Sequence, residues 1–391
     1  MQRSAPVTSM KNTSVKLTET RKQMPRLKQL DVVRGIAIIL VLIWHYLPRV
    51  QTSTPKFILT FTNIFWSGVD LFFVLSGFLI ATVLFNSVDS KNYYQVFYLR
   101  RAARILPLYL LLCFTFFIIK NLHISNLDAS QSNPIPLWSY LTFTQNFLMA
   151  QQDALNSPWM AVTWSLAVEE QFYIFLSLLI KNSSKSFIVG TSFALIVIAP
   201  IARFFLHPIP AYVLPFTRVD SLMLGVLLAL VWLNKSAQAL VYKYAFIFCL
   251  SFIFLLFVVG MLTYNNIHPG DAFGHSWLGL FYLNFIILAL MASSKITNLI
   301  FQNKLLEWFG LRSYGIYLLH IPIQISLTAL LASFPTLRLY GGIIVLLDTL
   351  IVLGISELSY RYFEKPIIKL GRKFEYDCEL SGNSELRQTR V

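Results

Sequence analysis

Long apolar runs separated by short polar segments dominate the 391 residues of this chain. About ten of these runs are long enough to cross a lipid bilayer as a helix, which takes roughly 20 residues. The expected spans are 32–48, 66–86, 105–124, 165–181, 186–206, 217–233, 241–262, 275–294, 307–330 and 340–362. The pattern predicts an all-α, polytopic integral membrane bundle.

One long connection interrupts this pattern at residues 125–164, which are rich in Asn, Gln, Ser and Pro. Within it, residues 137–149 are apolar but too short to span, so we expect an interfacial helix or an outer lid there. The polar ends of the chain, 1–25 and 372–391, are expected to be disordered.

Three parts are expected along the chain: a basic cytoplasmic tail at 1–29, a membrane domain at 30–367 and a second cytoplasmic tail at 368–391. Residues 1–29 lack the apolar core of a cleavable signal peptide, so the first span is expected to be a retained signal anchor. The three cysteines show neither a disulfide framework nor metal-ligand spacing, and no metal site is expected.

The charge distribution indicates the topology. Only 13% of the residues are charged, and the formal net charge is +14. On a soluble protein this excess would suggest nucleic-acid binding, but here the basic residues flank apolar runs, and no nucleic-acid partner is expected. Residues 1–29 and 87–104 are basic, whereas 121–164 contain no Lys or Arg. The positive-inside rule then places both termini in the cytoplasm.

Ionisable side chains at membrane depth are costly, so each is a functional candidate. Arg34 and His45 lie eleven residues apart in the first span. At about 100° per residue this spacing puts both on one helix face, roughly 16 Å apart along the axis. The alternative interpretation is that Arg34 reaches the inner headgroups while His45 makes a bundle contact. Asp31 is expected to cap the first helix or to pair with Arg34 at i,i+3.

The directions of the spans sort the other charges by depth. The carboxylates expected near the outer ends, at the depth of His45, are those of Asp70, Glu169, Glu170 and Asp220. The basic residues expected at the inner mouth are Arg34, Arg100, Arg101, Arg104, Lys304 and Arg312, with His320 between the two levels. The sequence therefore predicts a cationic inner mouth and an acidic outer chamber.

This arrangement suits a phosphorylated cytosolic ligand at the inner mouth, because Arg binds phosphate bidentately. A histidine near carboxylates can act as a general base on a hydroxyl while a carboxylate orients its ring. Two alternatives stay open. Asp70 or Glu170 could instead be the buried ion-pair partner of Arg218, and the cluster 100–104 could be a plain positive-inside anchor. The histidines at the outer ends, His207, His268 and His275, are expected to be solvated.

Seven segments resemble the membrane acyltransferase 3 family, which includes O-antigen and exopolysaccharide O-acetyltransferases. They are LDVVRGIAIILVLIWHY (30–46), GVDLFFVLSGFLI (68–80), FYLRRAARILPLYL (97–110), WSLAVEEQFYIF (164–175), RVDSLMLGVLLA (218–229), LRSYGIYLLHIP (311–322) and YRYFEKPI (360–367). The resemblance covers roughly residues 29–367.

This resemblance implies transfer of an acyl group, most simply acetyl, from cytosolic acyl-CoA (acetyl-CoA) to a hydroxyl of an extracytoplasmic glycan or lipid-linked saccharide. It also implies a multi-pass location in a bacterial plasma membrane, an essential Arg34–His45 pair and a CoA-side role for the basic motif around Arg101. The chain ends soon after the last span without an esterase-like domain. The membrane part is therefore expected to complete the transfer itself or to pass the group to another protein.

The expected roles follow from the depth sorting and the resemblance together. The predicted catalytic residues are His45, Arg34, Glu170 and Asp70; the predicted donor-binding residues are Arg100, Arg101, Arg104 and Arg34; and the predicted substrate-binding residues are Glu169, Tyr173, Asp220 and His320. His45 would deprotonate the acceptor hydroxyl or briefly carry the acetyl group, with Glu170 and Asp70 orienting it or the sugar. Tyr173 could instead be an aromatic packing residue.

Two other functions fit the same features. A polar interior with charges at both ends also suits a transporter of a glycan or lipid intermediate, although the sequence shows neither a repeated half nor a pair of broken helices. The enzyme could also acylate a small hydrophobic product, such as a macrolide, from the cytosolic side.

Overall fold

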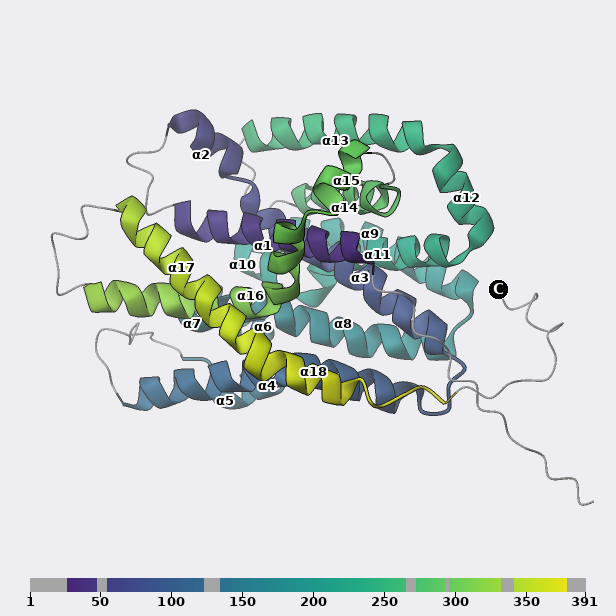
Figure 1. Cartoon of the computed structure of the whole chain (residues 1–391). Coiled ribbons are helices and arrows are strands. Elements are labelled where there is room, and N and C mark those ends of the chain that lie inside the picture. Colours follow the sequence, from purple (N-terminus) through teal and green to yellow (C-terminus); the bar gives the residue numbers. More distant parts are fainter. Residues whose placement is uncertain are drawn as a thin grey trace, which may run out of the picture.

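The computed structural model describes residues 27–47, 55–122, 134–264, 272–292, 295–331 and 341–377, and these form helices with no strand among them (Figure 1). The long helices are α1 (Lys28–Tyr46), α3 (Gly68–Ser87), α4 (Tyr93–Asn121), α8 (Thr163–Asn182), α9 (Lys185–Phe204), α11 (Pro215–Leu233), α13 (Ala245–Tyr264), α14 (Gly274–Leu290), α16 (Lys304–Leu330) and α17 (Gly341–Ser359). One of them coincides with each apolar run singled out in the sequence, so the all-α prediction is confirmed.

Shorter helices connect the long ones. They are α2 (Lys56–Thr62), η3 (Phe65–Ser67), α5 (Leu137–Leu141), α6 (Gln145–Gln151), α7 (Pro158–Ala161), α10 (Pro208–Val213), α12 (Lys235–Lys243), α15 (Lys295–Phe301), η6 (Tyr360–Glu364) and α18 (Lys365–Gly371). In Figure 1, α13 and α4 lie along opposite edges of the bundle, and α17 crosses the front before α18 follows α4. Residues 1–26 of the expected first tail, residues 378–391 of the expected second tail and His268 lie outside the described residues.

Six helical segments of the described chain are long and apolar enough to cross a membrane, or seven if the bent pair α12–α13 forms one span. This establishes a multi-pass membrane protein with fewer clear spans than the ten expected. Helix α14 is apolar but short. Helices α8 and α16 are long, but their polar side chains reduce their hydropathy, and both line the cavity described below.

Helices α1 and α16 run parallel and touch backbone to backbone. A Cβ added to Gly35 would lie 2.0 Å from the carbonyl oxygen of Leu306, and one added to Gly310 would lie 1.7 Å from that of Asp31. Glycines at such a crossing let membrane helices approach closely and maximise packing. The crossing therefore fixes the register between α1 and α16.

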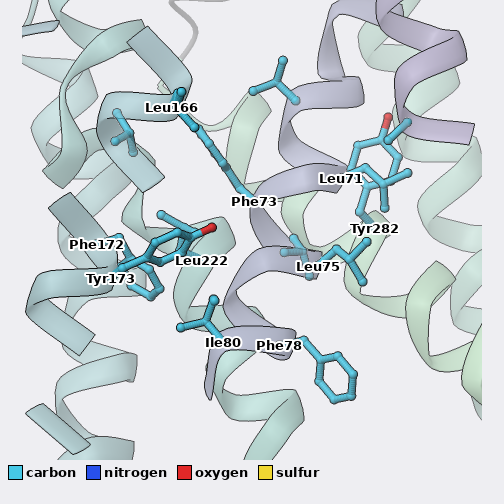
Figure 2. Packing of buried hydrophobic residues seen from close by; sticks show 14 of the residues in the cluster. Leu71, Phe73, Leu75, Phe78, Ile80, Leu166, Phe172, Tyr173, Leu222 and Tyr282 are labelled. Carbon is cyan, nitrogen blue, oxygen red and sulfur yellow. The ribbon is translucent and has the colours of Figure 1, made fainter. Parts of the chain in front are cut away.

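Helix α3 is the centre of the core. Fourteen of its 20 residues are buried, against three of the 19 of α17. It crosses α11 at a second glycine contact, where a Cβ on Gly77 would lie 2.0 Å from the carbonyl oxygen of Leu222. Phe73 points from α3 toward Leu166 of α8, while Leu71 turns to the opposite side, where Tyr282 of α14 lies (Figure 2). Burial on all sides explains why α3 has no polar face.

The apolar segment expected as a lid is the helix pair α5–α6, which packs into the bundle. Gln145 and Asn146 are fully buried at the start of α6. The Gln145 amide donates to the carbonyl of Thr163 (2.9 Å), and that of Asn146 donates to the carbonyl of Val213 (3.2 Å). These bonds tie the segment to α8 and α10, so it is a wall of the bundle rather than a helix lying on its surface.

The C-terminal segment after α18 lies along the beginning of α4. The Nε of Arg100 donates to the carbonyl of Phe374, and the amide of Asn92 donates to the carbonyl of Glu375, both at 2.9 Å. The prediction that disorder begins at residue 372 is therefore wrong for 372–377. We call residues 372–377 the strap. The strap is ordered because side chains at the beginning of α4 satisfy two of its backbone acceptors.

Candidate active site

A cavity lies between α1, α3, α4, α8 and α16. Its lining residues are Arg34, Val69, Phe72, Phe73, Ser76, Leu79, Ile80, Arg101, Arg104, Ile105, Ser165, Leu166, Glu169, Tyr173, Ser313, Tyr314, Tyr317 and Leu318. On each helix these positions recur every three or four residues, which places them on a single helix face. The cavity therefore runs along the helices, with its arginines toward one end.

Three arginines from α1 and α4 form the cationic end. Arg34 donates to Asp31 at 2.7 Å, which confirms the expected i,i+3 pair. The guanidinium of Arg101 lies 5.5 Å from the ring centre of Tyr173. Neither Arg101 nor Arg104 forms an ion pair with a carboxylate of the described residues. Two guanidinium groups that face a cavity without such partners make a binding site for an anion.

The carboxylate of Glu169 lies beside these arginines. Ser76 donates to one of its oxygens at 2.6 Å, and the Tyr173 hydroxyl donates to the other at 3.2 Å. The charges that act on Glu170 are those of Arg101 and Glu169. The prediction that Glu169 and Glu170 share the depth of His45 is therefore wrong. Glu169 is six residues into α8, about 9 Å from its N-terminus along the axis, and this reaches the level of the α4 arginines.

Asp70 belongs to a buried cluster on the other side of α3. Arg218 donates to it at 2.7 Å, and the ring of His275 lies 3.3 Å from both of its oxygens. This is the ion pair with Arg218 that the sequence left open as the alternative to a catalytic role. His275 is only 1% exposed, so the expectation that it is solvated is wrong. A buried ion pair needs further hydrogen-bond partners, and the His275 ring supplies one for the Asp70 carboxylate.

Asp220 is held in a second buried ion pair, with Arg203 of α9 at 2.8 Å. Ser276 also donates to it at 2.7 Å. Asp220 does not line the cavity, and the structure does not bring it to the other predicted substrate-binding residues. Its contacts instead join α9, α11 and α14.

The remaining basic residues of the expected inner mouth point away from the cavity. Arg100 binds the strap through Phe374 and lies over the ring of Tyr376. Arg312 forms an ion pair with Glu357 of α17, and Lys304 is exposed at the start of α16. The prediction that Arg100 shares one site with Arg101 and Arg104 is therefore wrong. One residue along an α-helix is a turn of about 100°, which carries Arg100 to a different face of α4 from Arg101.

His45 meets His320 where α1 and α16 lie side by side. The ring centres are 4.8 Å apart, and the rings meet edge to face. Nδ1 of His45 donates to the carbonyl of Val41 at 2.9 Å, and Nδ1 of His320 donates to that of Tyr317 at 2.7 Å. A carbonyl only accepts, so each Nδ1 carries a proton, and in the neutral form of each ring Nε2 carries the free lone pair. Nε2 of His320 is buried without a hydrogen-bond partner among the described residues.

No carboxylate of the described residues pairs with His45. The expectation that Glu170 and Asp70 orient its ring is wrong, because the backbone of its own helix does so through Val41. A fixed Nδ1–H with an unprotonated Nε2 is the tautomer that a general base requires.

Tyr317 connects the cavity to the histidine pair, and sequence reasoning missed it. Its ring centre lies 5.9 Å from that of His320, and its side chain also lines the cavity. Tyr314, Tyr317 and His320 recur at intervals of three in the segment LRSYGIYLLHIP. The register test that singled out Arg34 and His45 would have found this stripe as well.

The fold and the site define a multi-pass helical membrane protein with an arginine-lined cavity and, next to its lining residue Tyr317, a pair of histidines. The chain belongs to the acyltransferase 3 family, whose sequence profile, described as an acyltransferase domain, matches residues 27–356. The resemblance seen in the motifs is thereby confirmed.

Several curated bacterial proteins are similar to this chain. A Staphylococcus aureus (strain COL) protein named "Putative O-acetyltransferase" is 29% identical over 379 residues, which cover 90% of this chain and 59% of that protein. The Peptidoglycan O-acetyltransferase OatA of Listeria monocytogenes is 27% identical over 376 residues, 90% of this chain and 57% of OatA. A Bacillus subtilis protein named "Putative peptidoglycan O-acetyltransferase YrhL" is 27% identical, over 93% of this chain and 58% of that protein.

The chain thus spans less than two thirds of the length of these relatives. No solved structure matches it.

Proposed function

We propose that this protein is a membrane O-acetyltransferase that moves an acetyl group from cytosolic acetyl-CoA to a hydroxyl of an extracytoplasmic glycan. The observation that carries the proposal is one cavity between α1, α3, α4, α8 and α16, with three arginines at one end and Tyr317, whose ring centre lies 5.9 Å from that of His320, at the other. A donor with a phosphorylated head and a thioester at the far end of a long arm has the matching polarity.

In this proposal the arginine end holds the phosphates of the donor. Arg101 and Arg104 supply two guanidinium groups that form no direct ion pair with a carboxylate of the described residues, and Arg34 adds a third that Asp31 holds in place. Glu169 and Tyr173 would contact the donor arm rather than the sugar, because they lie at the arginine level. Glu170 would offset part of the positive field of Arg101.

In this proposal the histidine pair beside Tyr317 carries out the chemistry. Nε2 of His45 takes the proton from the acceptor hydroxyl while the hydroxyl oxygen attacks the thioester carbonyl. The carbon–sulfur bond then breaks, and the leaving thiolate takes the proton from His45. His320, whose ring centre lies 4.8 Å from that of His45, would accept a hydrogen bond through Nε2 from the acceptor or from His45 when the site is filled. In the alternative, Nε2 of His45 itself attacks the thioester carbonyl and carries the acetyl group until the acceptor hydroxyl takes it.

The acceptor we propose is peptidoglycan rather than O-antigen, because two of the similar proteins are named for peptidoglycan O-acetylation. The proposal includes the finer topology: ten crossings and both termini in the cytoplasm of a bacterium. In that orientation α1 runs outward, so Arg34 faces the cytosol and His45 faces the outer side.

The test uses purified protein with acetyl-CoA labelled in the acetyl group and soluble peptidoglycan fragments. We expect labelled acetyl esters on the fragments and release of free CoA with the wild type, and neither with His45→Ala at equal expression and equal thermal stability. Transport of fragments without acetyl transfer would instead establish the transporter alternative, and full activity of His45→Ala would overturn the catalytic assignment.

A further inference from the structure

The end of the cavity away from the arginines is apolar. It is formed by Val69 and Phe72 of α3, Leu166 of α8 and Leu318 of α16. Val69 and Ile80 of α3 both line the cavity, so it extends along eleven residues, roughly 16 Å. An apolar compartment at this distance from a phosphate site suits the acyl group of a thioester donor.

The side chain of Tyr317 closes this compartment and is fixed at both of its ends. Its hydroxyl shares a hydrogen bond with that of Ser165 at 2.6 Å and donates to the carbonyl of Val162 at 3.0 Å. Its ring meets that of Phe72 edge to face, with the centres 6.4 Å apart. A bond to Ser165 of α8, a bond to Val162 just before α8 and one aromatic contact to α3 leave the ring little room to move.

The ring of Tyr317 also neighbours that of His320, at 5.9 Å between the centres. His320 bonds the backbone carbonyl of Tyr317 through Nδ1, and its ring lies between those of Tyr317 and His45. Neither His45 nor His320 lines the cavity, so a thioester carbonyl that enters from the arginine end comes nearest to the histidine pair beside Tyr317. Every further carbon of the acyl chain would then press on the Tyr317 ring.

We propose that Tyr317 determines the acyl chain length, so that the compartment accepts an acetyl group and excludes longer chains. This inference rests on the proposed acyl transfer, and it gives that function its donor specificity. A longer chain has to displace a ring that is held by Ser165 and Val162. Discrimination by a pocket is worth roughly 10–200-fold for each methylene group.

The experiment compares kcat/KM for acetyl-CoA, propionyl-CoA and butyryl-CoA with soluble peptidoglycan fragments as the acceptor. We expect the wild type to prefer acetyl-CoA. In Tyr317→Ala, the ratio of kcat/KM for butyryl-CoA to kcat/KM for acetyl-CoA should rise by at least about tenfold. Tyr317→Phe keeps the ring and should keep most of the preference. The matched control is Tyr314→Ala, because Tyr314 also lines the cavity on α16 but donates to Ile105 on α4, beside the arginines.

An unchanged ratio of butyryl-CoA to acetyl-CoA in an active Tyr317→Ala protein overturns the inference and leaves the proposed function standing. A wild type that transfers no acyl group at all overturns the proposed function itself. Tyr317→Leu serves as the second variant. If both variants lack turnover, thermal stabilisation of the purified proteins by butyryl-CoA and by acetyl-CoA reports the preference directly, and an unchanged order again overturns the inference.

Discussion

His45 and His320 occupy equivalent positions in two parallel helices. Each histidine lies ten residues after the glycine at which α1 and α16 cross, Gly35 in one helix and Gly310 in the other. Ten residues rise about 15 Å in either helix, so both rings reach the same height, and their centres are 4.8 Å apart. The contact between the rings is thus a consequence of the glycine crossing.

Replacement of the two histidines should have unequal effects. His45→Ala removes the proposed base, and kcat should fall on the order of 10²–10⁴-fold. His320→Gln keeps a polar group beside the acceptor, so kcat should fall less, with KM for acetyl-CoA unchanged because the arginines are untouched. Initial rates over a donor titration measure both effects. His207→Ala, at an exposed position, is the control. Equal kcat values for His320→Gln and the wild type would contradict a role for the pair.

The three arginines of the segment RRAAR should separate by function. Arg101→Gln or Arg104→Gln removes a charged group from the cavity, and KM for acetyl-CoA should rise about 10–100-fold, since a hydrogen bond to a charged group contributes about 1.5–3 kcal/mol. Arg100→Gln should leave this KM unchanged, because Arg100 binds Phe374 of the strap. Initial-rate titrations of acetyl-CoA provide the comparison. A rise in KM for Arg100→Gln equal to that for Arg101→Gln would show that Arg100 also reaches the donor.

The glycine crossing should be intolerant of a methyl group. Gly35→Ala places a Cβ 2.0 Å from the carbonyl oxygen of Leu306, so α1 and α16 must separate. Overpacking of this kind typically costs about 1–3 kcal/mol. We expect a lower unfolding temperature in detergent and a loss of acetyl transfer as His45 moves from His320. Gly354→Ala is the matched control, because no atom lies within 4 Å of the added Cβ. Equal unfolding temperatures of Gly35→Ala and Gly354→Ala would argue against a tight crossing of α1 and α16.

The sequence predicted the helices and missed much of their arrangement. Apolar runs are a local property, so each expected span has a helix in the structure. Depth is also nearly local, and it placed Arg34 correctly with Arg101 and Arg104 in one cavity. It failed for Glu169, because the sorting counted residues near an outer end as level with His45 although Glu169 lies well inside α8.

Which side of a helix faces the cavity is a tertiary property. Arg100 and Arg101 are adjacent in the sequence, yet one binds the strap and the other faces Tyr173. Only the packing of α18 and residues 372–377 against α4 decides between them. The pairing of Asp70 with Arg218 is likewise a contact between distant segments, which the sequence could offer only as one of two alternatives.

The Asp70–Arg218 pair offers a test between a structural and a catalytic carboxylate. Both side chains are almost fully buried, and removal of one partner leaves an uncompensated charge, which costs about 3–5 kcal/mol. Asp70→Asn should therefore lower the unfolding temperature and the yield, while the molecules that fold keep a near-normal kcat. The double variant Asp70→Asn/Arg218→Gln should be less destabilised than the sum of the single variants.

Glu357→Gln is the control for this test, because its ion pair with Arg312 is more exposed and should contribute less to stability. Activity measured per folded molecule, with the folded fraction taken from gel filtration, separates the two roles. A stable Asp70→Asn protein without acetyl transfer would restore Asp70 to the catalytic site. A destabilised but active protein would assign Asp70 to the packing of α3 against α11 and α14. This packing holds in place the face of α3 that contacts Tyr317 of α16.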